Sequence, residues 1–133
     1  MIEISTDKKR LQITVIHKFL TESYWAKGRK IEEVKKSINN CLCFGVYVNE
    51  NQIGFARIAT DYTVFAYLMD VFILPEYRGK GYSKQLIKAI NEEPKLQSCK
   101  VWMLKTADAH GLYKQFGYTE LKHPEKVMER ILK

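Results

Sequence analysis

The chain has 133 residues, of which 46% are hydrophobic and 28% are charged, so its length suits one domain and its composition excludes a disordered or fibrous chain. The formal net charge of +7 is spread over both halves of the chain, which favours anionic ligands but speaks against the basic stripe of a nucleic-acid-binding domain. Three cysteines without a signal peptide, and no apolar run long enough to span a bilayer, argue against a disulfide framework and a membrane protein.

We therefore expect one cytoplasmic domain over residues 1–133, with no membrane and no nucleic-acid partner. No second Cys/His pair stands at zinc-site spacing from Cys41 and Cys43, so both are expected to be small buried apolar side chains. No metal is expected. The sequence leaves open whether the protein is a monomer or a homodimer.

The first predicted elements are a short strand and two helices. Alternating residues predict a strand over 2–5, and apolar residues at helical spacing predict an amphipathic helix over 13–24. Gly28 interrupts this pattern. The helical spacing then resumes and predicts a second, shorter helix over 31–38.

Three β-rich runs follow the helices. Runs over 43–48 and 53–60, joined by a polar turn, predict a hairpin, and a third run over 62–74 extends it to an antiparallel meander. A helix over 82–91 and a strand over 100–106 come next, and this order implies a crossover and a parallel pair. The predicted fold class is therefore α+β with a mixed sheet.

The C-terminal part is predicted to contain a short helix and two strands. The helix is expected over 108–116, with Asp108 as its N-cap and Gly117 at its C-terminal end. The terminal strands are expected over 118–122 and 126–132.

The stretch LPEYRGKGYSKQLIKAI, residues 74–90, places two glycines and two cations between a strand and a helix. It matches neither the Walker P-loop nor the G-x-G-x-x-G dinucleotide fingerprint. The remaining argument is that this stretch precedes a helix. The free amides of residues 79–83 and the helix dipole favour an anion at such an N-terminus. Arg78 and Lys80 add positive charge. A pyrophosphate would fit this junction, although a plain turn needs no ligand at all.

At this point the sequence resembles a known family. Residues 71–87, VFILPEYRGKGYSKQLI, are similar to the acetyl-CoA-binding motif [Q/R]-x-x-G-x-[G/A] of the GNAT superfamily of N-acetyltransferases. Arg78, Gly81 and Ser83 occupy its fixed positions, with Ser83 departing from the usual Gly or Ala. The second family signature, A-x-x-L-Y-x-x-x-G-[F/Y], is matched by Ala109, Leu112, Tyr113, Gly117 and Tyr118.

The resemblance covers roughly residues 44–121 and implies the GNAT fold, a mixed central sheet with an antiparallel meander, a βαβ-like crossover and flanking helices. It also implies an enzyme that transfers the acetyl group of acetyl-CoA, its co-substrate, to a primary amine by direct attack on the thioester. The amine would belong to a small molecule or a peptide. Segments such as SYWAKGR and GFARIATDY are further shared with small, mostly uncharacterised members of the superfamily.

The resemblance also implies where each substrate binds. The pantetheine arm of the co-substrate would pair with the strand formed by Val71, Phe72 and Ile73, like an added β-strand. Its pyrophosphate would lie on the loop of Arg78, Gly79, Lys80, Gly81, Tyr82 and Ser83. The helical segment over 20–40 would line the acceptor site, with Tyr24, Trp25 and Arg29 as its candidate contacts.

Two residues are candidates for catalysis. Tyr113 matches the family's tyrosine that protonates the departing thiolate, although a tyrosine on a short helix can also be a core aromatic. Asp70 stands in an otherwise apolar strand, where a buried carboxylate is costly unless it is paired or functional. It is a candidate general base with a raised pKa, a structural acceptor of backbone N–H groups, or a residue on the open side of the sheet.

Two other kinds of protein remain as alternatives. A non-catalytic acyl-CoA-binding or sensor module would keep the loop at 78–83 and lack the acceptor chemistry, so only turnover separates it from an enzyme. A basic nucleic-acid-binding domain is disfavoured by the evenly spread charge.

Overall fold

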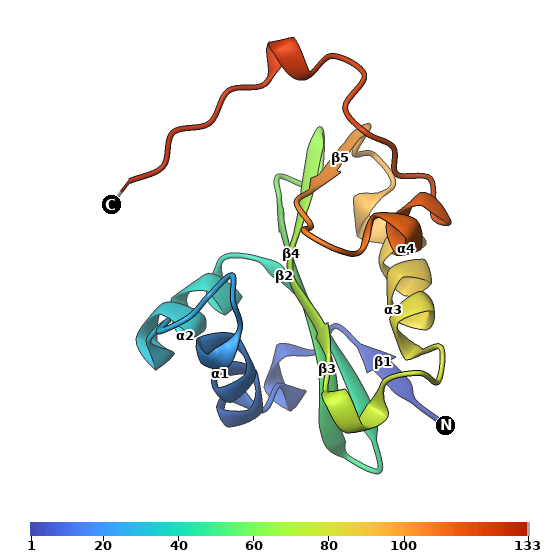
Figure 1. The fold of residues 1–133 in the computed structure, drawn as a ribbon. Coiled ribbons are helices and arrows are strands. Elements are labelled where there is room, and N and C mark those ends of the chain that lie inside the picture. The colour runs from blue at the N-terminus through green and yellow to red at the C-terminus, as the bar shows by residue number, and fades with distance from the viewer. Residues whose placement is uncertain (133) are drawn as a thin grey trace.

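The computed structural model describes residues 1–132, and its centre is a five-stranded sheet in the order β1-β2-β3-β4-β5 (Figure 1). All neighbouring strands are antiparallel except β4 and β5, which are parallel. The meander and the crossover predicted from the sequence are therefore confirmed. The strands are β1 (Glu3–Ser5), β2 (Leu42–Val48), β3 (Asn51–Thr60), β4 (Phe65–Ile73) and β5 (Val101–Leu104).

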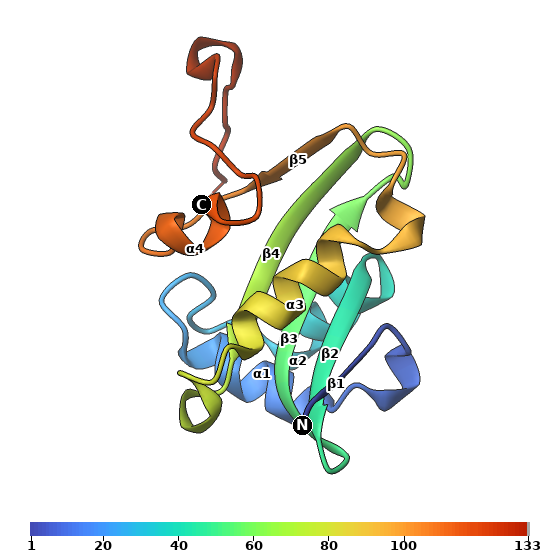
Figure 2. The same cartoon turned by 90° about the vertical axis from the view of Figure 1, so that its right-hand side faces the viewer.

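Helices cover both faces of the sheet (Figures 1 and 2). One face carries α1 (Ile13–Glu22) and α2 (Ile31–Asn39), and the other carries α3 (Tyr82–Asn91) and α4 (His110–Lys114). None of the helices within residues 1–132 is long and apolar enough to cross a membrane. Short 3-10 turns lie at Lys8–Arg10, Pro75–Tyr77, Pro94–Leu96 and Pro124–Lys126.

The periodic apolar residues of each helix form the core. Ile16 and Leu20 of α1 pack with Val34 and Ile38 of α2 against one face of the sheet. On the other face, the core side chains of α3 are Leu86, Ile87 and Ile90. Nearly all of β2 is buried, as expected for a strand that is covered on both faces.

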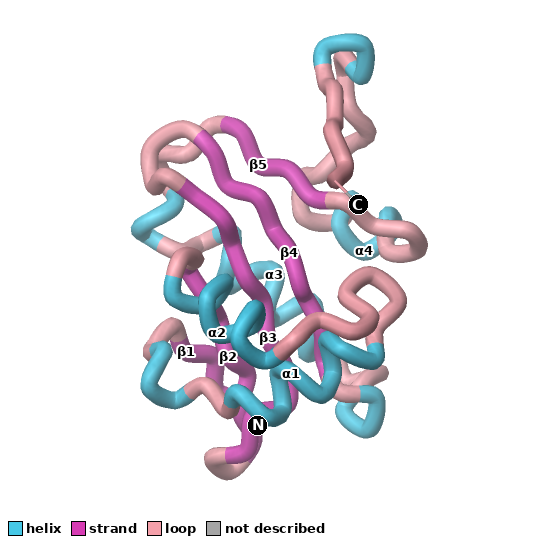
Figure 3. The backbone as a smooth tube through the Cα atoms, turned by 90° about the vertical axis from the view of Figure 1, so that its left-hand side faces the viewer, coloured by secondary structure: helices cyan, strands magenta, loops and turns pink. Residues whose placement is uncertain are grey.

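The parallel pair of strands is short, and this opens the sheet. β4 and β5 pair only from Phe65 opposite Val101 to Leu68 opposite Leu104. Beyond Leu68, no strand within residues 1–132 pairs with that edge of β4, and the two strands diverge (Figure 3). The backbone of residues 69–73 therefore has a free edge.

A β-bulge lies on β4 beside this free edge. Arg57 of β3 is opposite Met69, and Phe55 is opposite Phe72, so β4 carries two residues where β3 carries one. One of these two residues is Asp70, whose φ of +55° lies in the left-handed region that a residue with a side chain rarely adopts. The bulge changes the direction of the Asp70 side chain relative to a regular strand.

Two predictions about helix ends were wrong. The helix predicted over 13–24 ends at Glu22, because the chain becomes extended at Ser23. Asp108 does not cap α4; the helix begins at His110, and the amide of Ala109 donates to Oγ1 of Thr106 at 3.0 Å.

The two terminal strands predicted over 118–122 and 126–132 are absent from the described residues. Residues 121–132, here called the arm, extend away from the body of the protein (Figure 1). Their apolar side chains include Met128 and Leu132, which are 94% and 73% exposed. Apolar spacing alone predicted strands here, but neither segment joins the five-stranded sheet.

Candidate active site

A cleft of about 860 Å³ opens where β4 and β5 diverge. Its floor is the segment of β4 around Asp70, Val71 and Ile73. One wall comes from α1 and the loop after it and includes Tyr24, Trp25 and Arg29. The opposite wall comes from the end of β5 and α4 and includes Thr106, Leu112 and Tyr113, while Arg78 and Ser83 lie at one end.

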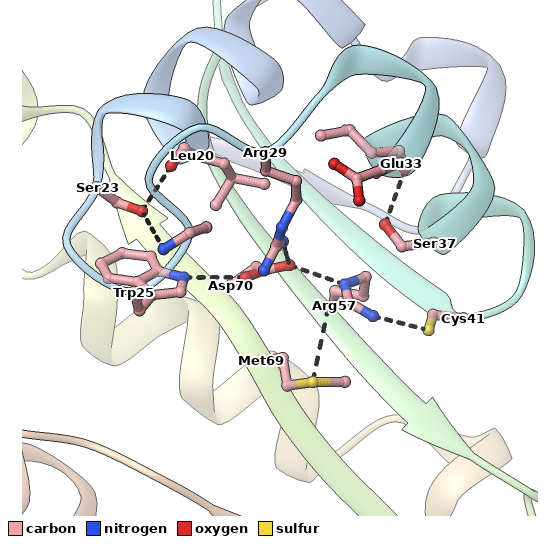
Figure 4. A network of polar contacts seen from close by, with 12 residues as sticks. Leu20, Ser23, Trp25, Arg29, Glu33, Ser37, Cys41, Arg57, Met69 and Asp70 are labelled. Atoms are coloured by element: carbon pink, nitrogen blue, oxygen red, sulfur yellow. Dashed lines mark hydrogen bonds and ion pairs between the residues drawn. The ribbon is translucent and has the colours of Figure 1, made fainter. Parts of the chain in front are cut away.

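The loop over 23–30 is fixed by its own hydrogen bonds (Figure 4). The hydroxyl of Ser23 donates to the carbonyl of Leu20 at 2.6 Å and accepts from the amide of Ala26 at 3.1 Å. Gly28 has a φ of +80° and donates its N–H to the carbonyl of Thr21 at 3.0 Å. This compact turn holds Trp25 and Arg29 over the sheet.

Asp70 joins three segments of the chain (Figure 4). Its Oδ1 accepts a hydrogen bond from the indole Nε1 of Trp25 at 2.9 Å. Its Oδ2 pairs with Nη1 of Arg29 at 2.7 Å and with Nε of Arg57 at 2.8 Å. The side chain of Asp70 is only 2% exposed, so this carboxylate is both buried and fully occupied.

The pKa of Asp70 is lowered from its ordinary value of 3.8. Burial alone would raise the pKa, but the charge of Arg57, the hydrogen bond from Trp25 and the charge of Arg29 together outweigh it. The raised pKa expected of Asp70 as a general base was therefore wrong. Of the three roles considered from the sequence, the geometry is nearest to the structural acceptor, with side-chain rather than backbone donors.

Arg57 is a residue of this site that the sequence analysis missed. Its Nη1 contacts the sulfur of Cys41 at 3.4 Å, and its Nη2 contacts the sulfur of Met69 at 3.6 Å. The available signal was a lone cation in one apolar strand and a lone carboxylate in the next strand of the meander. Such a pair of opposite charges predicts a buried ion pair between adjacent strands.

Tyr113 lines the cleft from α4 and is 8% exposed. Its ring packs edge-on against Tyr118, with 5.7 Å between the ring centroids. Burial raises the pKa of the Tyr113 hydroxyl to about 12, so the group stays protonated at neutral pH. The hydroxyl makes no hydrogen bond to any of residues 1–132.

The glycine loop lies between β4 and α3. Gly79 and Gly81 have φ values of +78° and +81°, and a Cβ at either position would stand in open space. Gly81 is the N-cap of α3 and offers no side-chain cap, which leaves the first amides of the helix free. Nε of Arg78 donates to the carbonyl of Ile73 at 3.0 Å and ties the loop to the end of the strand.

The structure brings most of the residues predicted for the site into one cleft. Its lining includes Tyr24, Trp25, Arg29, Asp70, Val71, Phe72, Ile73, Arg78, Ser83 and Tyr113. Gly79, Lys80, Gly81 and Tyr82 belong to the adjoining loop and are not part of that lining. No cluster of three or more His, Cys, Asp or Glu side chains that could hold a metal ion occurs within residues 1–132.

Comparisons with known proteins place this cleft in context. The family model described as acetyltransferase (GNAT) domain matches residues 39–120. A candidate acetyltransferase of the GNAT family from Xanthomonas campestris pv. campestris has a crystal structure that is 44% identical in sequence, with a TM-score of 0.97 over 99% of this chain and 94% of that chain. A candidate acetyltransferase of Gibberella zeae is 27% identical over 90% of this chain and 80% of its own length. A thialysine N-epsilon-acetyltransferase of Mus musculus is 33% identical over 44% of this chain and 37% of its own length.

Proposed function

The chain belongs to the GNAT family of acetyltransferases, and we propose that it transfers the acetyl group of acetyl-CoA to the nitrogen of a primary amine by direct attack on the thioester. The observation that carries this proposal is the free edge of β4 at residues 69–73, which forms the floor of the cleft beside Tyr113. An extended ligand can pair with such an edge as an added strand. Transfer to nitrogen is supported by the relative that is named for acetylating the ε-nitrogen of thialysine.

The residues of the cleft fit acetyl-CoA in three respects. The backbone of Val71, Phe72 and Ile73 offers the edge that the pantetheine chain needs, and the carbonyl of Ile73 on it already accepts from Nε of Arg78. The free amides at the start of α3, together with Arg78 and Lys80, offer donors and positive charge for the phosphates. The positive φ of Gly79 and Gly81, with open space in front of both, allows a phosphate to approach the backbone. When bound, the co-substrate supplies an activated acyl group.

Tyr113 stabilises the sulfur that leaves. A thiol has an ordinary pKa of about 8.5, whereas the pKa of Tyr113 is about 12. Full transfer of the tyrosine proton to a thiolate is therefore uphill. The hydroxyl acts as a hydrogen-bond donor to the developing thiolate, which is a role that a protonated and otherwise unpaired hydroxyl can fill.

Asp70 acts as a positioning residue. A carboxylate with a lowered pKa and three donors is a poor acceptor for an additional proton. It holds Trp25 and Arg29 against the floor of the cleft, and the acceptor amine loses its proton to water. An alkyl amine has a pKa of about 10, so the fraction of free amine limits the rate at neutral pH.

The test is a free-thiol release assay with acetyl-CoA across a panel of amines, amino acids and peptides, in which mass spectrometry identifies the acetylated product. Thiol released in step with product supports the transferase. A control without amine measures simple thioester hydrolysis. Tight binding of acetyl-CoA without any acetylated product would instead support a non-catalytic acyl-CoA-binding module.

A further inference from the structure

The buried cluster on the acceptor side of the cleft has one more positive charge than negative. Arg29 and Arg57 both pair with Oδ2 of Asp70, at 2.7 and 2.8 Å. Arginine stays charged in proteins, and Asp70 is ionised, so two cations share one anion. The other oxygen of Asp70 accepts from the neutral indole of Trp25. The cluster therefore carries a net charge of +1.

The excess charge is not offset by other groups near Arg57. The remaining contacts of its guanidinium are the sulfur atoms of Cys41 and Met69, which are neutral and weak acceptors. The side chain of Arg57 is only 11% exposed, so water reaches it poorly. An unbalanced charge in such a place is costly, and an anion that reaches the cluster would be stabilised.

Arg29 is the member of the cluster that a ligand can reach. Its side chain is 24% exposed and lines the cleft. It uses one of its five N–H donors on Asp70, and its side chain makes no other hydrogen bond to residues 1–132. The guanidinium is a planar fork that matches the oxygens of a carboxylate or a phosphate.

The other charges of the cleft lie elsewhere. Arg78 belongs to the loop proposed for the phosphates of acetyl-CoA, and Lys105 pairs with Glu129 of the arm at 2.5 Å. Asp108, the second carboxylate among the lining residues, stands on the opposite wall before α4. An anionic group on the acceptor would therefore find a cation on this side of the cleft. A second ammonium group would find no free carboxylate there.

We propose that the acceptor is a primary amine that also carries an anionic oxygen group, a carboxylate or a phosphate, and that Arg29 binds this group. This inference rests on the proposed N-acetyltransferase function. It adds the chemical class of the acceptor. The balanced pair of Arg57 and Asp70 supports the site from below, and Trp25 lies beside it as an apolar wall.

The test uses pairs of acceptors in which one member carries the anionic group and the other lacks it. β-Alanine and its amide, and lysine and its amide, form the carboxylate arm, while phosphoethanolamine and ethanolamine form the phosphate arm. With the full chain, kcat/KM is expected to be at least about 10-fold higher for the anionic member of one arm, as for loss of a charged hydrogen bond. Whichever of the two sets of compounds, carboxylate or phosphate, shows the preference identifies the anion. Equal rates within every pair, or a preference for the neutral members, would overturn the inference.

Arg29→Gln supplies the matched variant. It removes the excess cation and leaves Arg57 and Asp70 as a balanced pair, so the variant is expected to fold, with a Tm within a few degrees of that of the wild type. The preference within each pair should shrink to less than about 3-fold, mainly through a higher KM for the anionic member. Arg29→Lys should restore part of the preference. Lys27→Gln, an exposed residue of the same loop, should keep it. An undiminished preference in Arg29→Gln would contradict the role of Arg29.

A second readout separates the two proposals. Calorimetry measures the binding of each pair to the protein loaded with CoA, whether or not an amine is acetylated. Tighter binding of the anionic members without turnover would support the charge recognition and contradict the transferase. Turnover of neutral amines as fast as anionic ones would support the transferase and contradict the charge recognition.

Discussion

Asp70 combines an unusual backbone with an unusual set of partners. Its φ of +55° costs about 1–3 kcal/mol in a residue with a side chain. The bulge nevertheless directs the carboxylate toward Trp25, Arg29 and Arg57 at once. Two donors from the loop over 23–30 and one from β3 stabilise a conformation that a regular strand would not adopt.

The lowered pKa of Asp70 predicts how stability depends on pH. Because the folded-state pKa lies below 3.8, the ionised group contributes stability above that pH, and this contribution is lost as the pH falls through the lower, folded-state pKa. Asp70→Asn leaves two arginines without a counter-ion. At pH 7 it should cost about 3–5 kcal/mol of unfolding free energy. The difference from the wild type should stay constant down to about pH 5 and shrink below about pH 4.

Urea unfolding at a series of pH values measures this difference, with the exposed Asp108→Asn as control. If Asp70→Asn does not fold, NMR titration of the Asp70 carboxyl in the wild type gives the same answer. A pKa above 3.8, or a stability difference that already shrinks between pH 7 and 5, would contradict the ion-paired carboxylate.

Tyr113→Phe keeps the ring and removes only the hydroxyl. If the hydroxyl stabilises the leaving sulfur, kcat should fall by about 10²-fold, while the Kd of acetyl-CoA stays nearly constant. Steady-state kinetics and calorimetry measure the two quantities. Because the pKa of Tyr113 is about 12, its ionisation should produce no limb in the wild-type pH–rate profile between pH 6 and 10.

Tyr118→Phe is the matched control for Tyr113. The hydroxyl of Tyr118 is buried and has no hydrogen-bond partner within residues 1–132, so its loss should leave kcat within a few-fold. Equal effects of the two substitutions would assign Tyr113 to packing alone.

At the scale of the elements, β4 and α3 are joined by a loop that depends on glycine. Gly81→Ala places a methyl group in the open space in front of the α3 amides and strains a φ of +81°. Calorimetry should show acetyl-CoA binding weakened by about 10-fold or more, as for loss of a charge-assisted hydrogen bond. Gly28→Ala is the control, because Gly28 has a similar φ of +80° and open space in front of it, on the other side of the cleft. It should leave that affinity nearly constant, and equal weakening by both variants would show backbone strain to be the cause.

The elements were largely predictable because local patterns specify them. The helix predicted over 82–91 was found with the same bounds, since its apolar spacing and the glycines before it both indicate that it begins at residue 82. The bulge at Asp70 was not predictable, because period-2 alternation carries no sign of an extra residue. The pKa of Asp70 was also missed, since it depends on Arg29 and Arg57, which are 41 and 13 positions away in the chain. The sequence motifs were enough to predict which residues form the cleft. Which charged side chains pair across the strands can be seen only in the folded structure.

At the scale of the whole molecule, the arm contributes little to the folded body. Its apolar side chains are exposed, and the pair of Lys105 and Glu129 lies at the surface, where water and salt screen the attraction between the two charges. Truncation after Glu120 is therefore expected to lower Tm by only a few degrees. Thermal unfolding and light scattering of the full and truncated chains check this. A large loss of Tm together with a change in oligomeric state would show that the arm is bound by a second copy.

The two tryptophans of the chain lie in different surroundings, and this has an optical consequence. Trp102 of β5 donates its indole N–H to the carbonyl of Cys99 and lies outside the cleft lining, whereas Trp25 is 40% exposed and bonded to Asp70 at the acceptor side. Replacing Trp102 with Phe would leave Trp25 as the one tryptophan of the chain. The polarity around its indole changes when a molecule enters beside Arg29. The fluorescence of Trp25 would therefore report whether the acceptor site is occupied, without an added label and without turnover.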